Sequence, residues 1–584
     1  SAHRWTRLAW ITCGSGIFLC ETLRTLINKY IELANPDKSL KKFQEKIKQL
    51  LKENIFGNDI NPEAIEIAKF SLFITLLDYF EDPKHIEGFE FPNISNNFSN
   101  YDVFDTELDT IFGKDKLVEP DFIIGNPPWG KIDNSRYLDY IKEREQKENK
   151  LKKDHWTEDN KPVKDFEPDE IGISNREFAQ AFLVRLSDFS TETTTCHVIV
   201  TSKLLYNLQA NKFRHYFLTH YLINEILEIS SVRHQIFSKT VGPAAIIKYK
   251  YAFSVDTKDN LIEYVSLKPN PYYALFKTIL IEKIDYKEVV QNELIQNDWL
   301  WKVLVYGHIL DFRFIGRLRD KNRFPMTLGN LIANQDNQDR PLFASVGIKI
   351  IKKNQNSDAR HLKGLHFIQT DTNKIKKNSD LQRYYIEFRN NSIWTKDTAA
   401  EVRTEQLFKF PPALLVKIGF TADFKLVASI SNRECVFTNS IYAIKSKESK
   451  LQILENLLGL VNSDLMTYYM IMCGSSIGVE REQLINKELF PFPVIEDNKI
   501  SVLIKQLTDL KQQIEIHKRD SIFSDSEINQ YERQFIEKEA ELNQLIFELY
   551  NLSETEMDLI SYAQEISIPI LQEKKKKYSE VNID

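Results

Sequence analysis

The sequence has few cysteines, and their spacing argues against two classes of site. Its 584 residues include five cysteines, Cys13, Cys20, Cys196, Cys435 and Cys473, and none form a Cys-x-x-Cys pair. Structural zinc sites need such close pairs, and disulfide-stapled chains carry cysteines in even sets. We therefore expect neither kind of site, and a chain that works in the reducing cytoplasm. His155, His197 and His234 have no partners at ligand spacing, so we expect no metal site.

Long apolar runs and an excess of positive charge are also missing. No run approaches the roughly 20 apolar residues of a membrane-spanning helix, and the first residues lack the apolar core of a signal peptide. We expect no membrane partner. The formal net charge of −6 is not that of a uniformly basic nucleic-acid coat. A local basic cleft stays compatible with it, because only the surface that faces phosphate must attract it.

The pattern of the chain predicts several domains of different class. Its length is too great for one ordinary core. In residues 1–265 short apolar strands alternate with amphipathic helices, which predicts an α/β domain with a parallel sheet. We expect a polar loop or insertion at about 131–172. We then expect a helical connector at 266–323, a mixed α+β domain of short strands at 324–497, and a helical hairpin with a charged tail at 498–584.

The stretch "PDFIIGNPPWGK", Pro120 to Lys131, combines a buried strand with a stiff loop. Two adjacent prolines forbid helix and favour extended backbone before each of them. The Asn126 side-chain oxygen and the Pro127 carbonyl are hydrogen-bond acceptors. Pro128 stiffens the loop, and Trp129 offers a flat face. Together they fit an exocyclic amine on a planar ring. The alternative is a rigid turn whose tryptophan belongs to the core.

Two further loops follow predicted strands of the same sheet, whose carboxyl ends are where ligands bind. Gly14 and Gly16 flank Ser15 just before a helix, where glycine lets the backbone approach a ligand. The alternative is a simple connecting turn. Asp59 ends another strand and is placed to accept the hydroxyls of a ribose. The alternative, capping of the next helix, suits Asn61 better.

The motifs "CGSGIFL", "GNDINPEAIEIA" and "DFIIGNPPWG", in this order, resemble a known family. They are similar to S-adenosylmethionine-dependent N6-adenine DNA methyltransferases of the TaqI and Eco57I type, which are type II or IIG restriction-modification methylases. The resemblance implies a Rossmann-like methyltransferase sheet and a TaqI-like target-recognition domain at 324–497. It implies that Asn126, Pro127, Pro128 and Trp129 are catalytic and that Trp129 and Phe237 stack on the target base. The cofactor residues that it implies are Cys13, Gly14, Ser15, Gly16, Asp59, Ile60, Asp102 and Val103.

The sequence departs from this family just before the glycine turn. The family has an acid and a proline there, roughly Asp-Pro-Ala-Cys-Gly-Ser-Gly, whereas this chain has Trp10, Ile11 and Thr12 before Cys13. The acid that would meet the methionine ammonium group is absent, and almost nothing precedes the turn. We therefore expect an N-terminally truncated or frame-disturbed chain with impaired cofactor binding. A nuclease component would lie upstream or on a separate protein.

The resemblance implies methylation of adenine in a specific sequence of double-stranded DNA, within a restriction-modification or phage-defence system. Basic and polar runs at 347–364 and 370–383 would contact phosphates and bases, or would simply be solvated loops. Alternative substrates are cytosine in DNA, an RNA base or a protein glutamine, but the large C-terminal region favours DNA. A different class of function is a non-catalytic DNA reader that has lost its cofactor site.

Overall fold

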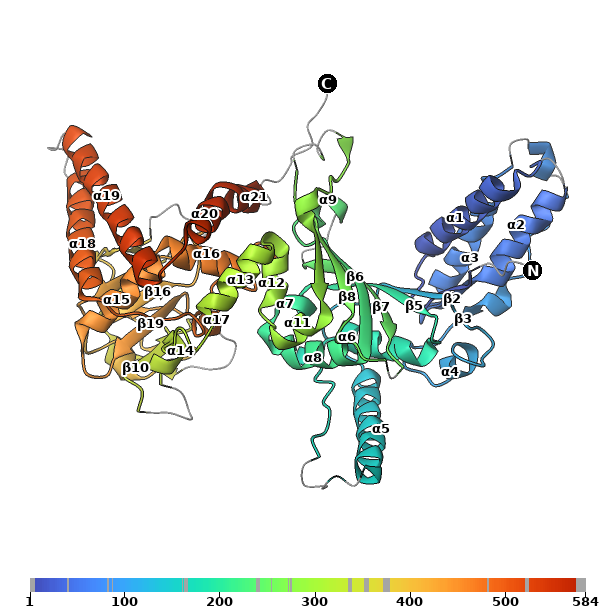
Figure 1. Cartoon of the computed structure of the whole chain (residues 1–584), viewed down its shortest axis with the longest axis horizontal. Helices are drawn as coiled ribbons and strands as arrows, with labels where there is room; N and C mark the ends of the chain where they lie inside the picture. Colours follow the sequence, from blue (N-terminus) through green and yellow to red (C-terminus); the bar gives the residue numbers. More distant parts are fainter. Residues whose placement is uncertain are drawn as a thin grey trace. The chain divides into compact units, whose positions relative to one another are not determined.

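The chain divides into two compact units, which we describe separately. In this computed structural model, unit 1 comprises Ser1–Lys268 and Ile279–Trp301, and unit 2 comprises Pro269–Thr278 and Lys302–Asp584. The structure describes residues 6–573 apart from 39–40, 81–82, 87, 160, 162–165, 238–241, 254, 271–272, 274–275, 334–338, 351–356, 371–378, 480–482 and 520–524. Figure 1 shows the elements of both units, coloured along the sequence from blue at the N-terminus to red at the C-terminus.

Unit 1 is built on a nine-stranded sheet in the order β3-β2-β1-β4-β5-β7-β6-β8-β9. Strands β1 to β5 pair in parallel, and β7 runs antiparallel to both of its neighbours, β5 and β6. The sheet confirms the predicted α/β class. Its strands are β1 (Leu8–Trp10), β2 (Ile55–Asn58), β3 (Phe98–Ser99), β4 (Phe122–Gly125), β5 (Thr195–Thr201), β6 (Tyr221–Glu228), β7 (Ala244–Tyr251), β8 (Leu261–Ser266) and β9 (Tyr286–Val290).

Helices pack beside this sheet through apolar stripes at helical spacing. In α1 (Ile17–Ala34) the buried residues Leu19, Leu23 and Ile27 recur every four positions and join one core with β1, β2 and the next two helices. The start of α3 follows from its sequence, because Asn61 accepts a hydrogen bond from the Glu63 N–H and Pro62 occupies the first turn. The other helices of unit 1 are α2 (Lys41–Asn54), α3 (Pro62–Leu77), α4 (Leu108–Ile111), α5 (Arg136–Glu158), α6 (Phe178–Arg185), α7 (Lys203–Tyr206), α8 (Asn211–His220), α9 (Arg233–Ile236) and α11 (Gln291–Gln296).

Of the two alternatives expected at 131–172, the polar loop is wrong, because this segment contains the 23-residue helix α5, and the insertion stays a prediction. The helix projects from the rest of unit 1 in Figure 1. It buries only Tyr137 and Ile141, so no apolar stripe marks it in the sequence. Polar contacts with the returning chain hold its far half: Asn149 and Asp169 exchange two hydrogen bonds of 2.8 and 2.7 Å.

The segment predicted as a helical connector also contains a strand. Residues 286–290 form β9, which pairs antiparallel with β8 and extends the large sheet. The helices α11, α12 (Leu300–Tyr306) and α13 (Ile309–Leu318) follow it. Strand β9 was missed because its pairing with β8 is a tertiary contact that local composition does not report. Our placement of the three boundaries between the four predicted segments stays a prediction.

Unit 2 combines small sheets with helices, and all of these sheets are antiparallel except the parallel pair β12–β18. Its four-stranded sheet has the order β10-β19-β16-β17, and its core includes Leu415, Phe437 and Ala443. The strands are β10 (Leu342–Val346), β16 (Ala413–Lys417), β17 (Ala428–Ser431) and β19 (Ile441–Ser446), and short pairs form from β11 (Ser357–Asp358), β12 (His366–Ile368), β13 (Leu381–Gln382), β14 (Tyr385–Ile386), β15 (Thr398–Ala399) and β18 (Cys435–Phe437).

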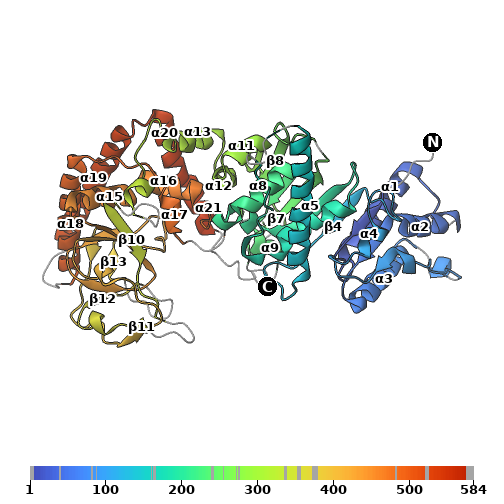
Figure 2. The same cartoon turned by 90° about the horizontal axis from the view of Figure 1, so that it is seen from below.

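Helices complete unit 2, and two long ones confirm the expected C-terminal helical segment. α18 and α19 lie side by side in Figures 1 and 2. Residues 351–356 and 371–378 of the basic runs 347–364 and 370–383, and the tail beyond residue 573, lie outside the described residues. Besides α13, its helices are α14 (Leu328–Leu331), α15 (Leu451–Asn462), α16 (Asp464–Cys473), α17 (Asn486–Leu489), α18 (Asn498–Arg519), α19 (Asp525–Leu549), α20 (Glu554–Tyr562) and α21 (Ile568–Glu573).

No helix within the described ranges is long and apolar enough to cross a membrane.

Candidate functional site

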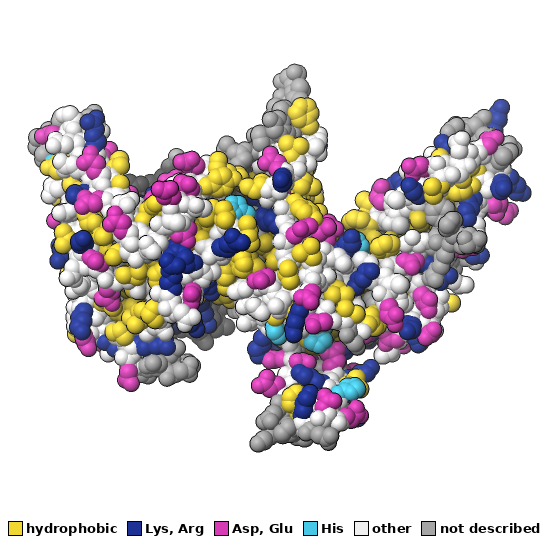
Figure 3. Space-filling model, viewed as in Figure 1, with side chains coloured by type: hydrophobic (Ala, Val, Ile, Leu, Met, Phe, Trp, Pro, Cys, Tyr) yellow, Lys and Arg dark blue, Asp and Glu magenta, His cyan; other side chains and the backbone are white. Residues whose placement is uncertain are grey.

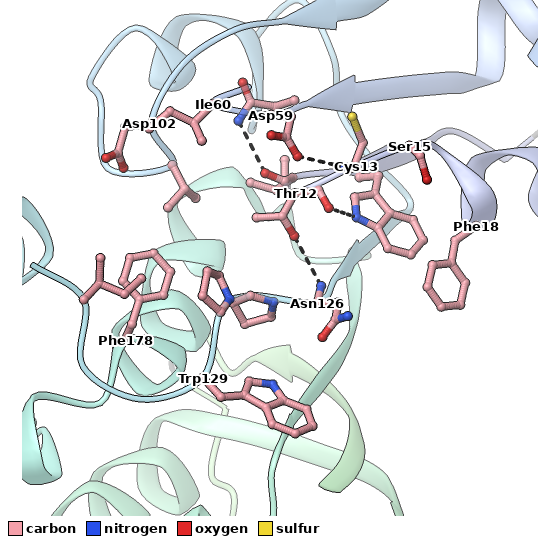
Figure 4. A pocket seen from close by; sticks show the side chains of 18 of the residues that line it. Thr12, Cys13, Ser15, Phe18, Asp59, Ile60, Asp102, Asn126, Trp129 and Phe178 are labelled. Carbon is pink, nitrogen blue, oxygen red and sulfur yellow. Dashed lines mark hydrogen bonds between the residues drawn. The ribbon is translucent and has the colours of Figure 1, made fainter. Parts of the chain in front are cut away.

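A cavity of about 860 Å³ opens at the carboxyl ends of β1, β2 and β4. The strand order of the sheet changes direction at β1, which lies between β2 and β4. Loops that leave neighbouring parallel strands on opposite sides separate at such a point and leave a crevice for a ligand. The three loops that the sequence singled out, after β1, β2 and β4, all line this cavity (Figure 4).

The turn after β1 depends on two glycines in the left-handed region. Gly14 has φ +49° and Gly16 has φ +80°, and the Gly16 N–H donates to the Cys13 carbonyl at 2.9 Å. A Cβ at Gly14 would meet nothing within 4 Å, so its backbone borders open space. A Cβ at Gly16 would lie 2.7 Å from the Ala68 Cβ. Gly14 thus leaves room in the cavity, and Gly16 lets α1 approach α3.

We expect the two glycines to respond differently to alanine. Gly16→Ala combines left-handed strain with a backbone clash, because its Cβ would also lie 2.9 Å from the Ala68 Cα. We expect it to lower the free energy of unfolding by about 2–4 kcal/mol. Gly14→Ala meets only the backbone strain, about 1–2 kcal/mol. Urea denaturation of both variants measures the difference, and equal losses would contradict this account of the turn.

Asp59 joins the first two loops through its carboxylate. Its Oδ2 accepts the Gly14 N–H at 2.8 Å, and its Oδ1 accepts the Asn61 N–H at 2.9 Å. A carboxylate oxygen can accept two hydrogen bonds, so each oxygen of Asp59 can accept one more. The carboxylate therefore fixes the glycine turn and still has capacity for a ligand hydroxyl. Capping of α3 is the work of Asn61, as predicted.

Burial and the Asp59 charge raise the pKa of the Cys13 thiol to about 12. Cys13 is therefore a neutral thiol near pH 7, and it has no thiolate with which to act as a nucleophile.

The loop Asn126–Gly130 is anchored by its backbone, while its polar acceptors stay free. The Asn126 N–H donates to Thr12 Oγ1 at 3.3 Å, and Gly130 exchanges hydrogen bonds with Glu177 and Phe178. Within the described part of the chain, the Asn126 side-chain amide and the Pro127 carbonyl have no hydrogen-bond partner. Both residues line the cavity. Two fixed acceptors thus remain available to a ligand.

Two aromatic rings flank these acceptors. Trp129 is half-buried, and its Nε1–H donates to the Ile199 carbonyl at 3.4 Å. Trp129 and Phe237 pack against the same small apolar cluster, which includes Val232 and Ala244. Both rings also line the same cavity as the Asn126 amide.

Asp102 forms a different wall of the cavity, and its carboxylate is already engaged. Asp102 Oδ1 accepts the Phe104 N–H at 3.0 Å, and Oδ2 accepts Asn134 Nδ2–H at 2.9 Å. Val103 beside it is buried and also lines the cavity. The second hydrogen bond links this wall to the chain that leaves the Asn126 loop.

All but one of the predicted site residues line this cavity. Gly16 is the exception, since it supports the turn from behind. The roles of these residues stay predictions. Sequence reasoning missed ten further lining residues: Trp10, Ile11, Thr12, Ile17, Phe18, Asn58, Tyr101, Ile132, Asn134 and Phe178.

Two of these residues carried a signal in the sequence. Trp10 stands where the family has an acid, and it stacks on Phe18 with ring centroids 4.4 Å apart. Phe178 is the first residue of α6, a helix that the sequence pattern predicts. Asn58 carried none, although its amide, which is almost fully buried, bonds the Tyr101 carbonyl at 3.0 Å and so ties β2 to the Asp102 wall.

Among the described residues, no three His, Cys, Asp or Glu side chains are placed to hold a metal ion.

Comparisons with known proteins agree with this geometry. The model of the Eco57I restriction-modification methylase family matches residues 53–237, which include the Asp59 and Asn126 loops. The model of the TaqI-like C-terminal specificity domain matches residues 373–494 in unit 2. No curated protein matches the sequence.

Several solved structures resemble the chain at low identity. The Type IIL restriction-modification enzyme MmeI in complex with DNA is 13% identical with a TM-score of 0.52, over 97% of this chain and 73% of MmeI. A nuclease-deletion mutant of the Type ISP enzyme LlaGI with a DNA substrate mimic is 12% identical with a TM-score of 0.47, over 86% of this chain and 44% of LlaGI. The likeness to MmeI shows a shared fold.

The expected resemblance is thus confirmed, and the two domains indicate DNA methylation in restriction-modification. The chain carries an Eco57I restriction-modification methylase domain followed by a TaqI-like C-terminal specificity domain, the combination of a TaqI/Eco57I-type methylase.

Proposed function

We propose that this chain transfers a methyl group from S-adenosylmethionine to the exocyclic N6 amine of adenine in a specific double-stranded DNA sequence. The observation that carries the proposal is the pair of free acceptors, the Asn126 amide oxygen and the Pro127 carbonyl, beside Trp129. The adenine amine has two hydrogens, one for each acceptor, and the adenine ring has a flat face that can stack on the Trp129 indole. In a restriction-modification or phage-defence system, a nuclease component on another segment or protein would supply the cleavage.

The cavity fits the adenosyl part of S-adenosylmethionine. Its volume of about 860 Å³ is ample for such a ligand. The free positions on the Asp59 oxygens suit the ribose hydroxyls, and Gly14 leaves the backbone open. Ile60, with 67% of its surface exposed, and the buried Phe178 line the same cavity and suit the two faces of a purine.

The other end of the cavity suits the cofactor less well. Asp59 and Asp102 are the acidic residues among those that line it, and Trp10 and Phe18 are aromatic. The α-ammonium group would therefore meet no carboxylate beside Trp10. We expect weak cofactor binding, and this keeps a non-catalytic DNA reader as the second candidate function.

Access to the target amine requires the base to leave the duplex stack. Trp129 and Phe237 would receive the flipped ring, with stacking worth about 1–3 kcal/mol per base. This offsets part of the unstacking free energy, which is a few kcal/mol. The TaqI-like specificity domain would select the sequence by its contacts with base edges and phosphates. The face shown in Figure 3 carries interspersed charges of both signs on its described residues, so recognition by this face would rest on local clusters.

The chemistry needs orientation more than acid–base catalysis. The amine lone pair is delocalised into the ring, which makes the nitrogen a poor nucleophile. When Asn126 Oδ1 and the Pro127 carbonyl accept the two amine hydrogens, the nitrogen moves toward tetrahedral geometry and its lone pair points out of the ring plane. When bound, S-adenosylmethionine supplies an electrophilic methyl group, so that the N–C bond forms as the S–C bond breaks. The methylated nitrogen then loses its proton to water readily, and the site acts by proximity.

The test is methyl transfer from labelled S-adenosylmethionine to duplex DNA from a host without adenine methylation, followed by nucleoside analysis. Labelled N6-methyladenine is the expected product. Labelled methylcytosine would identify cytosine, not adenine, as the target base. Label in RNA or in added protein would identify an RNA base or a protein glutamine as the substrate. If the protein binds DNA but transfers no label at saturating cofactor, its function would be that of a non-catalytic DNA-binding protein.

A further inference from the structure

Arg185 lies behind the Asp102 wall of the cavity and does not line it. It is the last residue of α6, and only 2% of its surface is exposed. Two acids neutralise its guanidinium: Nη1 lies 2.6 Å from Asp188 Oδ2 and 2.8 Å from Asp109 Oδ1. The guanidinium also lies over the Phe189 ring, 4.5 Å from its centroid. Charge and packing thus hold this side chain in one place.

The remaining donors of Arg185 reach two backbone carbonyls of the cavity wall. Nε–H donates to the Val103 carbonyl at 2.9 Å, and Nη2–H donates to the Asp105 carbonyl at 3.0 Å. These carbonyls belong to the irregular segment after β3, about 80 positions earlier in the chain. No sheet ladder holds that segment, so its path depends on such bonds.

The same segment contributes three residues to the cavity lining, Tyr101, Asp102 and Val103. Asp102 and Val103 line the cavity, and the Asp105 N–H donates to the Asp102 carbonyl at 2.9 Å. Fixing the carbonyls of residues 103 and 105 therefore sets where Asp102 and Val103 point. The planar fork of arginine donates in two directions at once, which a lysine ammonium on its flexible stem does not reproduce.

We infer that Arg185 is a positioning residue for the cofactor end of the cavity. It acts through the Val103 and Asp105 carbonyls and touches no ligand itself. This inference rests on the proposed function for the identity of the ligand. It assigns to α6 a role in ligand affinity that its sequence, an apolar helix, does not suggest.

Arg144 offers a matched control. It lies in α5, pairs with the same Asp188 and with Glu148, and donates to Ser187 Oγ at 3.3 Å. Arg144 thus belongs to the same charge network but makes no hydrogen bond or ion pair with the described residues Val103–Asp105. Arg144→Lys measures how weakening the charge network affects the stability of the fold. Arg185→Lys weakens the same network and also removes the hydrogen bonds to the Val103 and Asp105 carbonyls.

The experiment measures S-adenosylmethionine binding by calorimetry, and hydrogen exchange of the Phe104 and Asp105 amides in the ligand-free protein. We expect Arg185→Lys to weaken binding about tenfold or more and to speed exchange at both amides. We expect Arg144→Lys to change neither, even where it lowers the melting temperature as much. In turnover assays Arg185→Lys should raise KM for the cofactor and leave kcat nearly unchanged.

Unchanged exchange in Arg185→Lys, or equal effects in both variants, would overturn the inference. Failure of the wild-type protein to bind S-adenosylmethionine would count against the proposed function instead. In that case the exchange data on the ligand-free protein still decide whether Arg185 positions the wall.

Discussion

Replacing Asn126 by alanine is expected to slow methyl transfer about 100- to 1,000-fold, the effect of removing one aligned polar group from a reacting centre. The Asn126 side chain faces the cavity without a partner among the described residues, so its removal breaks no internal hydrogen bond of the side chain. The loop keeps its backbone bond to Thr12. The loss should therefore fall on kcat, with S-adenosylmethionine affinity and DNA affinity within about twofold of wild type.

Single-turnover transfer of labelled methyl groups, with separate titrations of cofactor and DNA, measures this. Asn175→Ala is the control, because Asn175 precedes α6 and its amide contacts Gln209 outside the cavity. It should transfer methyl groups at the wild-type rate. If Asn126→Ala also turned over normally, the amine-holding role would be wrong, and a rigid turn would explain the loop.

Replacing Asp59 by alanine is expected to weaken cofactor binding about 10- to 100-fold, from the 1.5–3 kcal/mol of hydrogen bonds to a charged group. The carboxylate has positions left for ligand hydroxyls after it accepts the Gly14 and Asn61 N–H groups. The variant also leaves those two donors without their acceptor, so we expect a loss of stability as well. Calorimetric titration with S-adenosylmethionine measures the first effect and urea denaturation the second.

Asp78→Ala separates the two effects. Asp78 caps the far end of α3 and pairs with Arg24 at 2.8 Å, away from the residues that line the cavity. It should cost some stability and leave the cofactor affinity unchanged. An Asp59→Ala protein that binds the cofactor as tightly as wild type would show that the carboxylate only holds the turn.

Much of unit 1 could be predicted because local signals and tertiary structure agree there. Asn61-Pro62 marks the start of α3, and the glycines of the turn after β1 adopt the positive φ that their residue type suggests. The site followed from the parallel sheet, since the loops after its strands meet at one edge. The ring of Phe237 came from the resemblance alone, and no pattern in the chain indicates that it lies near Trp129.

Features that depend on polar or distant contacts escaped prediction. Helix α5 has no apolar stripe, and its far half is held by side-chain bonds such as Asn149 to Asp169. Strand β9 depends on β8 for its pairing. Arg185 reads as one charge in an apolar helix, because its role appears only when residues 103 and 105 come near it. Such contacts join positions that are far apart in the sequence, so no local sequence pattern indicates them.

The division of the chain bears on how the specificity of such a protein would be exchanged. Residues 269–278 belong to unit 2, although residues 279–301 return to unit 1. A chimera joined only at the boundary between Trp301 and Lys302 would keep ten residues of the original unit 2 beside a unit 2 from another protein. A clean graft needs three junctions, near residues 268, 278 and 301, and gene fragments cut at a single point should give poorly assembled hybrids.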